Sequence, residues 1–379
     1  MNKLLKQLAE FSQQPFDQAL TAPPAVYSSA EIYELEQQRI FASEWQCVGR
    51  AAEISEIGDY ISAEIGGTSI IVVRQKDGSI KALSNICQHR CSKLLKGSGC
   101  VSSIVCPYHA WAYRLDGQLI GTRHMEQTDG FDTSIVRLPA IRCELWHGFI
   151  YVTLDEQALP VATLLQNFDA VLAPYQLDNY VHAYTYEERW PANWKCFVEN
   201  YLDAYHVFKV HKNTFGVFGN FESATRMFDG GEQFTYHLIE GDEAFDYRAN
   251  PADGVAHPNN IGLTGALRAQ TVLAAIFPNQ TMQLQPDLLW YVLVQPDGAD
   301  HLKLRWSVSI APEIMKDEAQ GKKFVEDSRK LLVAVNAEDE VVIPGVYAGT
   351  KDPNAARSCY SHLERNVFRF GCYLAAKIC

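Results

Sequence analysis

Two cysteine–histidine pairs carry the clearest chemistry in this sequence. Cys87 and His89 form the first pair, and Cys106 and His109 form the second, after the sixteen intervening residues 90 to 105. Two thiolates can hold one iron of a two-iron, two-sulfur cluster and two neutral imidazoles the other, which raises the reduction potential above that of an all-thiolate cluster. The same four ligands would also satisfy tetrahedral zinc. Zinc loops usually pair cysteine with cysteine and histidine with histidine, so the repeated mixed pair favours the iron–sulfur cluster.

A second group of candidate ligands lies further along the chain. Asp203, His206 and His211 form the pattern Asp-x2-His-x4-His. On a continuous helix Asp203 and His206 would share one face, whereas His211 would be rotated from His206 by roughly 140°. We therefore expect the helix to bulge or end between the two histidines. A His-x4-His pair alone is often no more than two surface histidines, but two histidines and a carboxylate leave octahedral Fe(II) three open positions for dioxygen and substrate.

The elements that must position these residues follow two different patterns. From about residue 47 to 155, short β-rich runs are broken by glycine turns, which indicates a small antiparallel β domain. The strands predicted there are 60–65, 69–74, 80–85, 111–114 and 148–154. A helix is expected over 28–46, and after residue 156 helical patches alternate with strands, which predicts an α+β domain with helices on one side of a sheet. The predicted helices there are 161–175, 194–206 and 316–335, and the predicted strands are 182–189, 234–240, 290–295 and 302–311.

Length and composition narrow the function classes. A chain of 379 residues suits two domains. Its formal net charge of -12 argues against nucleic acid and anionic membranes as partners. The apolar runs are of strand length, too short to span a membrane, and no signal-peptide hydrophobic region follows the first residues. We therefore expect a cytoplasmic protein whose ten cysteines are reduced thiols or metal ligands.

The first constellation resembles a known family. Cys-x-His followed by Cys-Pro-Tyr-His-Ala-Trp and by Leu115-Asp116-Gly117 is similar to the Rieske domain of ring-hydroxylating and quaternary-amine oxygenases. The resemblance implies a [2Fe–2S] cluster held by Cys87, His89, Cys106 and His109, and a mononuclear non-haem Fe(II). It also implies an α+β protein in which an antiparallel β Rieske domain, 47–155, is inserted into a helix-grip catalytic domain, 156–379. The segment 1–46 would pack on the catalytic domain.

The same resemblance implies the third iron ligand. It lies in Asn336-Ala337-Glu338-Asp339, with Asp339 as the candidate and Glu338 as the alternative. Many relatives continue this helix with a glutamate and a glutamine where this chain has Pro344 and Tyr347. Proline removes a helical hydrogen bond, so we expect Pro344 to kink or end the helix.

Electron transfer in the family also implies a role for Asp203. Relatives assemble as head-to-tail rings, usually trimers, because the two metal centres of one chain are too far apart. Asp203 would then accept hydrogen bonds from a cluster histidine of one subunit and from His206 of the next. Asn200, in the same segment, is the other residue expected to serve the reaction. A reductase or a ferredoxin would supply the electrons.

The substrate is less clearly indicated. The segments Ser84-Asn85-Ile86-Cys87 and Asn193-Trp194-Lys195 resemble the branch that includes choline, carnitine and betaine monooxygenases, which hydroxylate or N-demethylate quaternary ammonium compounds. Aromatic faces attract such cations, and the candidate lining residues are Tyr201, Tyr205, Trp290 and Tyr291. The alternative substrate is an aromatic acid or an aryl ether. A different class altogether, a Rieske electron carrier or a structural zinc protein, would need no His206, His211 and Asp339.

Overall fold

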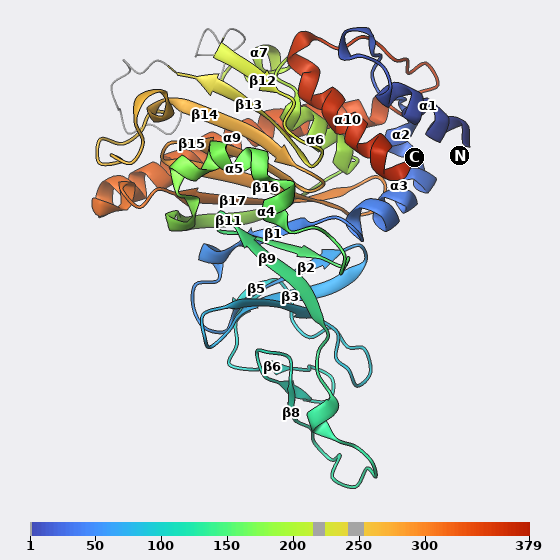
Figure 1. Cartoon of the computed structure of the whole chain (residues 1–379), viewed down its shortest axis with the longest axis vertical. Helices are drawn as coiled ribbons and strands as arrows, with labels where there is room; N and C mark the ends of the chain where they lie inside the picture. Colours follow the sequence, from blue (N-terminus) through green and yellow to red (C-terminus); the bar gives the residue numbers. More distant parts are fainter. Residues whose placement is uncertain (1, 215–223, 242–253) are drawn as a thin grey trace. The chain divides into compact units, whose positions relative to one another are not determined.

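A computed structural model describes residues 2–214, 224–241 and 254–379 (Figure 1). The chain divides into two compact units. One is formed by residues 37–161, and the other combines residues 1–36 with residues 162–379. The sequence-based division placed the corresponding boundaries after residues 46 and 155.

The unit 37–161 is built from two antiparallel sheets. Its seven-stranded sheet has the order β1-β10-β9-β4-β3-β2-β5, and its three-stranded sheet the order β6-β7-β8. The strands of the larger sheet are β1 Gln46–Arg50, β2 Asp59–Ile65, β3 Thr68–Arg74, β4 Ile80–Ser84, β5 Ser98–Cys100, β9 Ala140–Trp146 and β10 Phe149–Thr153. Those of the smaller sheet are β6 Ile104–Val105, β7 Ala112–Tyr113 and β8 Leu119–Gly121. All five strands predicted in this region are present, and β7 is shorter than predicted.

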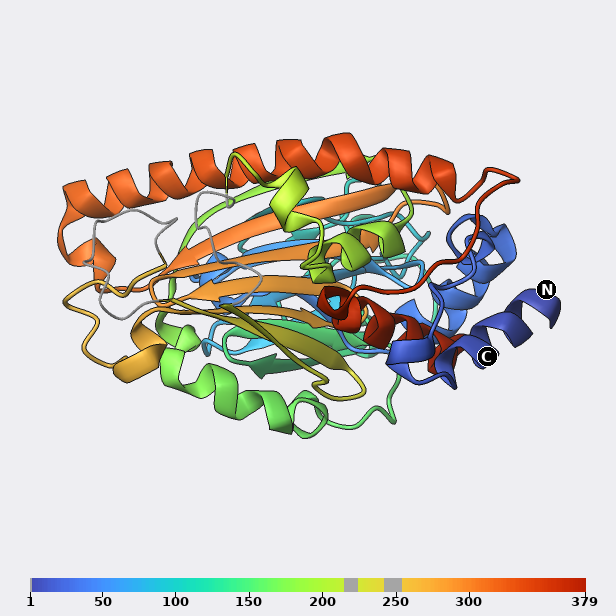
Figure 2. The ribbon, with the colours of Figure 1, turned by 90° about the horizontal axis from the view of Figure 1, so that it is seen from above.

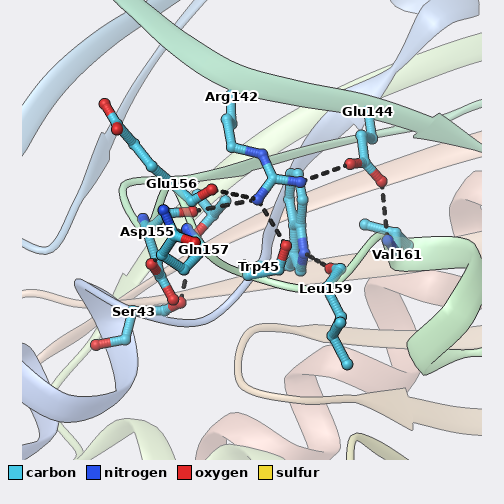
Figure 3. Close-up of polar contacts among 11 residues, drawn as sticks. Ser43, Trp45, Arg142, Glu144, Asp155, Glu156, Gln157, Leu159 and Val161 are labelled. Carbon is cyan, nitrogen blue, oxygen red and sulfur yellow. Dashed lines mark hydrogen bonds and ion pairs between the residues drawn. The ribbon is translucent and has the colours of Figure 1, made fainter.

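The end of this unit is held by an arginine on β9 (Figure 3). Arg142 donates to the carbonyl oxygen of Ala158 at 2.6 Å and to the carboxylate of Glu144 at 3.0 Å. The other Glu144 oxygen accepts the backbone N–H of Val161 at 2.8 Å, and the Arg142 guanidinium lies 4.9 Å from the centroid of the Trp45 ring. The chain that leaves β10 is therefore fastened to β9 as far as Val161, which explains why the unit extends beyond residue 155.

The other unit contains a second seven-stranded antiparallel sheet, of order β11-β17-β16-β15-β14-β13-β12. Its strands are β11 Val181–Trp190, β12 Thr225–Phe228, β13 Phe234–Glu240, β14 Gln270–Ile276, β15 Gln280–Gln285, β16 Leu288–Pro296 and β17 Leu302–Ile310. Its helices are α1 Asn2–Ser12, α2 Ala25–Ser28, α3 Ala30–Glu36, α5 Gln166–Leu172, α6 Trp194–Leu202, α7 Val207–Val210, α9 Glu318–Gly349 and α10 Arg365–Ile378. The short α4, Val161–Leu164, begins at the boundary between the units.

Helices α6, α9 and α10 cover one face of this sheet (Figure 2). Residues opposite one another on neighbouring strands point to the same face, and one such row runs from β11 to β13. Its members are Tyr186, Trp306, Val292, Thr281, Ala275 and Thr235. Phe197 of α6 packs on Trp306 with ring centroids 5.7 Å apart, and Asn336 of α9 donates to the Tyr186 hydroxyl. The α+β class, with an antiparallel sheet covered by helices, is confirmed.

The helices differ from the prediction in several places. The helix expected over 28–46 is α3, Ala30–Glu36, followed by a π-helical turn at Gln37–Phe41, and the helix expected over 161–175 is divided into α4 and α5. The helix predicted over 194–206 ends at Leu202, because Asp203 adopts an extended conformation with φ -82 and ψ 104. The helix predicted over 316–335 is α9, which begins at Glu318, does not end at Pro344 and continues to Gly349. The carbonyl that loses its partner belongs to Glu340, an exposed residue where water can satisfy it, while the buried Ile343 and Tyr347 keep the helix packed. Among the described residues, no helix combines the length and the apolar character needed to cross a membrane.

Candidate iron–sulfur and iron sites

Two similar loops present the cysteine–histidine pairs. The first follows β4, and the second joins β6 to β7. In the first loop the Cys91 N–H donates to the Cys87 carbonyl at 3.1 Å, and in the second the Ala110 N–H donates to the Cys106 carbonyl at 3.0 Å. Cys91 and Ala110 both adopt left-handed backbone conformations, with φ 55 and φ 57. Each loop therefore closes on its cysteine in the same way, and the two histidine rings come within 4.6 Å, centroid to centroid.

The sulfur atoms lie inside the unit and the imidazoles lie toward its surface. Cys87 and Cys106 are buried, whereas His89 is exposed. The Tyr113 hydroxyl lies 3.2 Å from the Cys87 sulfur. Burial opposes ionisation of Cys106, but backbone N–H groups of His109 and Tyr108 outweigh it and lower the pKa of this thiol. Two neighbouring sulfurs, one of them favoured as thiolate, and two adjacent imidazoles fit a Rieske cluster.

His206, His211 and Asp339 converge at the second site. The Nε2 atoms of the two histidines are 3.1 Å apart, and Asp339 Oδ1 lies 3.3 Å from His211 Nε2 and 3.7 Å from His206 Nε2. The two histidines stand at the two ends of the short helix α7: His206 is its N-cap, and the helix ends at Val210, so that His211 leaves the helical conformation with φ -94 and ψ 24. The helix thus ends between the two histidines, as their spacing required. Asp339 comes from α9, which contacts α7.

The spacing of these three atoms fits one metal ion. Donor atoms about 2.1 Å from a common octahedral ion lie about 3.0 Å apart when they occupy neighbouring positions. Burial alone would lower the pKa of His211, but the Asp339 and Glu338 carboxylates raise it, so the surroundings favour a positive charge. These two histidines and one carboxylate are therefore suited to hold a ferrous ion.

Glu338, the alternative ligand, occupies a different place. Its Oε2 accepts the Nδ1–H of His211 at 2.9 Å and the hydroxyl of Thr214 at 2.7 Å. It therefore faces the side of the His211 ring opposite to Nε2. Asp339, the next residue, presents its carboxylate to the Nε2 atoms instead.

Asp203 lies beside His206 without sharing a helix with it. Its Oδ1 accepts the backbone N–H groups of Tyr205 at 2.6 Å and His206 at 3.3 Å, and its Oδ2 is 3.5 Å from His206 Nδ1. The carboxylate thus fixes the turn that follows α6. It also faces Nδ1, the outer nitrogen of His206, which is the ring nitrogen that does not point toward the other two candidate ligands.

The structure brings together only some of the aromatic residues that were predicted to line the substrate pocket. Trp290 is buried on the sheet face that α6 and α9 cover, with its ring 5.8 Å from that of Trp306. Tyr291 is the next residue on the same strand, so its side chain points to the opposite face. Tyr205 is 49% exposed. Tyr201 lies on the last turn of α6 beside Asn200, and its hydroxyl is buried without a hydrogen-bond partner among the described residues.

The segment Asn193-Trp194-Lys195 has a structural role that the sequence did not reveal. Asn193 caps α6 by accepting the Lys195 N–H at 3.1 Å. The fully buried Lys195 ammonium lies 2.5 Å from a carboxylate oxygen of Glu36, and the Trp194 indole donates to the other oxygen at 2.8 Å. This ion pair fixes α6 to α3, and with it the position of Asp203 and α7.

Comparison with known proteins identifies the family. The family described as Ring hydroxylating alpha subunit (catalytic domain) matches residues 177–378, more than half of the chain, and the Rieske [2Fe-2S] domain matches residues 44–153. The chain belongs to the ring-hydroxylating alpha subunit family. The Rieske domain and the catalytic domain together support a [2Fe–2S] cluster and a mononuclear iron, and an oxygen-dependent oxidoreductase in place of a simple electron carrier or a structural zinc protein.

Relatives of this ring-hydroxylating alpha subunit include monooxygenases. The carnitine monooxygenase oxygenase subunit of Acinetobacter pittii is 35% identical over 214 residues, which cover 56% of this chain and 57% of the relative. The match therefore spans little more than half the length of that relative. The chloroplastic choline monooxygenase of Arabidopsis thaliana is 26% identical over 99% of this chain and 87% of its own length.

Solved structures share the whole fold. The quaternary ammonium Rieske monooxygenase CntA in complex with L-carnitine aligns over 98% of both chains, with a TM-score of 0.78 and 23% identity. Naphthalene 1,2-dioxygenase from Rhodococcus sp. bound to indole aligns over 100% of this chain and 98% of its own, with a TM-score of 0.83 and 19% identity. At these identities the likeness describes the fold alone.

Proposed function

We propose that this protein is the oxygenase component of a multicomponent Rieske monooxygenase that hydroxylates or N-demethylates a small quaternary ammonium compound. The observation that carries the proposal is the convergence of His206, His211 and Asp339, in a chain that also holds a Rieske domain. Such a ferrous site keeps three open positions on one face and supplies dioxygen activation when the ion is bound.

In this proposal His206 and His211 each present Nε2 to the iron, and Asp339 adds one carboxylate oxygen. Cys87 and Cys106 would hold one iron of the cluster, with His89 and His109 on the other. The exposed position of His89 supports electron transfer through the imidazole side of the cluster.

Asp203 would connect the two kinds of centre between subunits. We infer that copies of the chain associate head to tail, as a trimer, so that Asp203 accepts a hydrogen bond from His89 or His109 of the partner subunit. Its Oδ2 already faces His206 Nδ1, and its side chain is 21% exposed, which leaves it open to a second donor. A heterologous contact of this kind closes into a ring. A reductase or a ferredoxin would reduce the cluster, and we place the reaction in the cytoplasm, where the ten free cysteines would stay reduced.

The aromatic side chains that α9 contacts near Asp339 support a cationic substrate. Asn336 lies three residues before Asp339 on α9, and residues at this spacing share one helix face. It contacts Tyr186, whose ring stacks on Trp306 at 5.9 Å, and Trp290 follows in the same cluster. Aromatic faces attract quaternary ammonium groups through cation–π interactions. The names of the carnitine and choline relatives support the same substrate class.

Metal analysis and oxygen uptake test the proposal. We expect about three irons and two sulfides per chain, and substrate-dependent oxygen uptake with carnitine, choline or a betaine in the presence of a reductase. If only benzoates or aryl ethers stimulated oxygen uptake, the substrate would instead be an aromatic acid or an aryl ether. Zinc without sulfide, in protein made with ample iron, would overturn the oxygenase itself.

A further inference from the structure

Each histidine of the second site has a carboxylate at its outer nitrogen. Asp203 Oδ2 lies 3.5 Å from His206 Nδ1, and Glu338 Oε2 lies 2.9 Å from His211 Nδ1. The two pairs look alike but differ in their surroundings. Asp203 also accepts two backbone N–H groups from the turn after α6, whereas the Glu338 oxygen accepts only the hydroxyl of Thr214 besides the imidazole, among the contacts of the described residues.

We infer that Glu338 is a positioning residue that retains the ferrous ion by orienting His211, a role distinct from the electron-transfer role of Asp203. The inference rests on the proposed function. Glu338 and Asp339 are consecutive residues of α9, and they contact opposite nitrogens of one imidazole: Asp339 Oδ1 is 3.3 Å from Nε2. The helix therefore holds the His211 ring from both sides.

The hydrogen bond to Glu338 decides which nitrogen of His211 carries the proton. A carboxylate accepts but does not donate, so Nδ1 carries the hydrogen and Nε2 keeps the lone pair for the metal. The interaction is well shielded, because the His211 side chain is 5% exposed and that of Glu338 20%. Thr214 donates to the same oxygen at 2.7 Å and fixes its position. Carboxylates that orient a ligating histidine in this way typically raise metal affinity or activity roughly 10- to 100-fold.

Ferrous iron titration of protein that keeps its Rieske cluster tests the inference. We expect Glu338→Gln, which preserves shape but removes the charge, to raise the dissociation constant for iron about 10- to 100-fold. Thr214→Val should raise it about 3-fold, because the Glu338–His211 bond remains. Glu340→Gln is the matched control, since this exposed glutamate lies on the same helix and loses the same charge. The EPR signal of the nitric oxide adduct of the ferrous ion should change shape in Glu338→Gln alone, while the reduced-cluster signal stays constant in all three variants.

Asp203→Asn completes the test. We expect it to bind iron within about 2-fold of the parent, because the Asp203 carboxylate is 3.5 Å from His206 Nδ1, a much weaker contact than the 2.9 Å hydrogen bond between Glu338 and His211. Equal iron binding by Glu338→Gln and Glu340→Gln would overturn the inference, as would an Asp203→Asn variant that loses as much iron as Glu338→Gln. A parent protein that binds iron only in its cluster would overturn the proposed function as well, so the two failures are distinguishable.

Discussion

The four residues of the cluster site and the three of the iron site are positioned by different means. Cys87, His89, Cys106 and His109 stand on two loops of one small unit, and each loop closes by a short backbone hydrogen bond back to its own cysteine. His206 and His211 are also close in sequence, but Asp339 reaches them only because α9 packs across α7. A site built from local loops can be recognised from spacing, whereas a site built by packing depends on how helices lie on a sheet.

The strongest test of this comparison is to remove one site and follow the other. We expect the double variant His206→Ala and His211→Ala to lose the mononuclear iron completely, so that the iron content falls from about three to about two per chain. The cluster should keep its iron, its sulfide and its EPR signal, because its loops belong to a separate compact unit. Loss of the cluster signal in this variant would show that the two sites fold together.

A second test separates metal binding from electron transfer. Asp203→Asn keeps the size of the side chain and its hydrogen bonds to the turn but removes the charge that faces His206 Nδ1. We expect both metals to remain and substrate-coupled oxygen consumption to fall about 100-fold. Steady-state oxygen uptake, with iron analysis of the same samples, measures both quantities. Full activity would remove Asp203 from the electron-transfer path.

A third test concerns the stability of the protein around α6, the helix that precedes the turn of the iron site. Glu199 accepts the Tyr27 hydroxyl at 2.7 Å, and burial is the main cause that raises the pKa of its carboxyl to about 7, against partial compensation by Tyr27 and Lys195. The negative charges of Asp203 and Glu364 raise it further.

This raised pKa makes the stability of the protein depend on pH. The unfolded chain releases the Glu199 proton near the ordinary value of 4.5, but the folded chain holds it until about pH 7. The free energy of unfolding should therefore fall as the pH rises from 4.5 to 7, by about 3 kcal/mol from this group, and stay level above that range. In Glu199→Gln, which still accepts the Tyr27 hydroxyl, this loss should disappear. Urea midpoints of both proteins at pH 5 and pH 8 measure the difference, and an equal fall in both would assign the pH dependence to other groups.

The limits of prediction from sequence follow the same division. The strands around the cluster were predicted because alternation and glycine turns are local signals. Tyr113 could have been found from its place two residues after Trp111, since residues at this spacing in an extended chain share a face, and the two do lie in the same buried cluster. The different positions of Glu338 and Asp339 could not be predicted. The two residues are adjacent on one helix, and only the packing of α9 against α7 decides which carboxylate reaches the Nε2 atoms. The course of α9 past Pro344 was also unpredictable, because it depends on the burial of Ile343 and Tyr347 by the rest of the fold.

The smallest expected effect lies at the cluster. The Tyr113 hydroxyl is 3.2 Å from the Cys87 sulfur and also accepts the Gln88 N–H at 3.1 Å, so its own proton is directed toward the sulfur. A hydrogen bond to a cluster sulfur stabilises the reduced form, which carries more negative charge, and raises the potential. We expect Tyr113→Phe to lower the reduction potential by about 40 mV, the equivalent of roughly 1 kcal/mol for one electron.

Redox titration of the EPR signal measures that shift, and Tyr108→Phe is the matched control, because the exposed Tyr108 hydroxyl contacts Arg90. Iron binding at His206 and His211 should be unchanged in both variants. An unchanged potential in Tyr113→Phe would mean that water replaces the hydroxyl at the sulfur. In that case the two loops alone, and not Tyr113 of β7, would set the reduction potential of the cluster. The contrast with the iron site, which depends on the packing of α9 against α7, would then be sharper still.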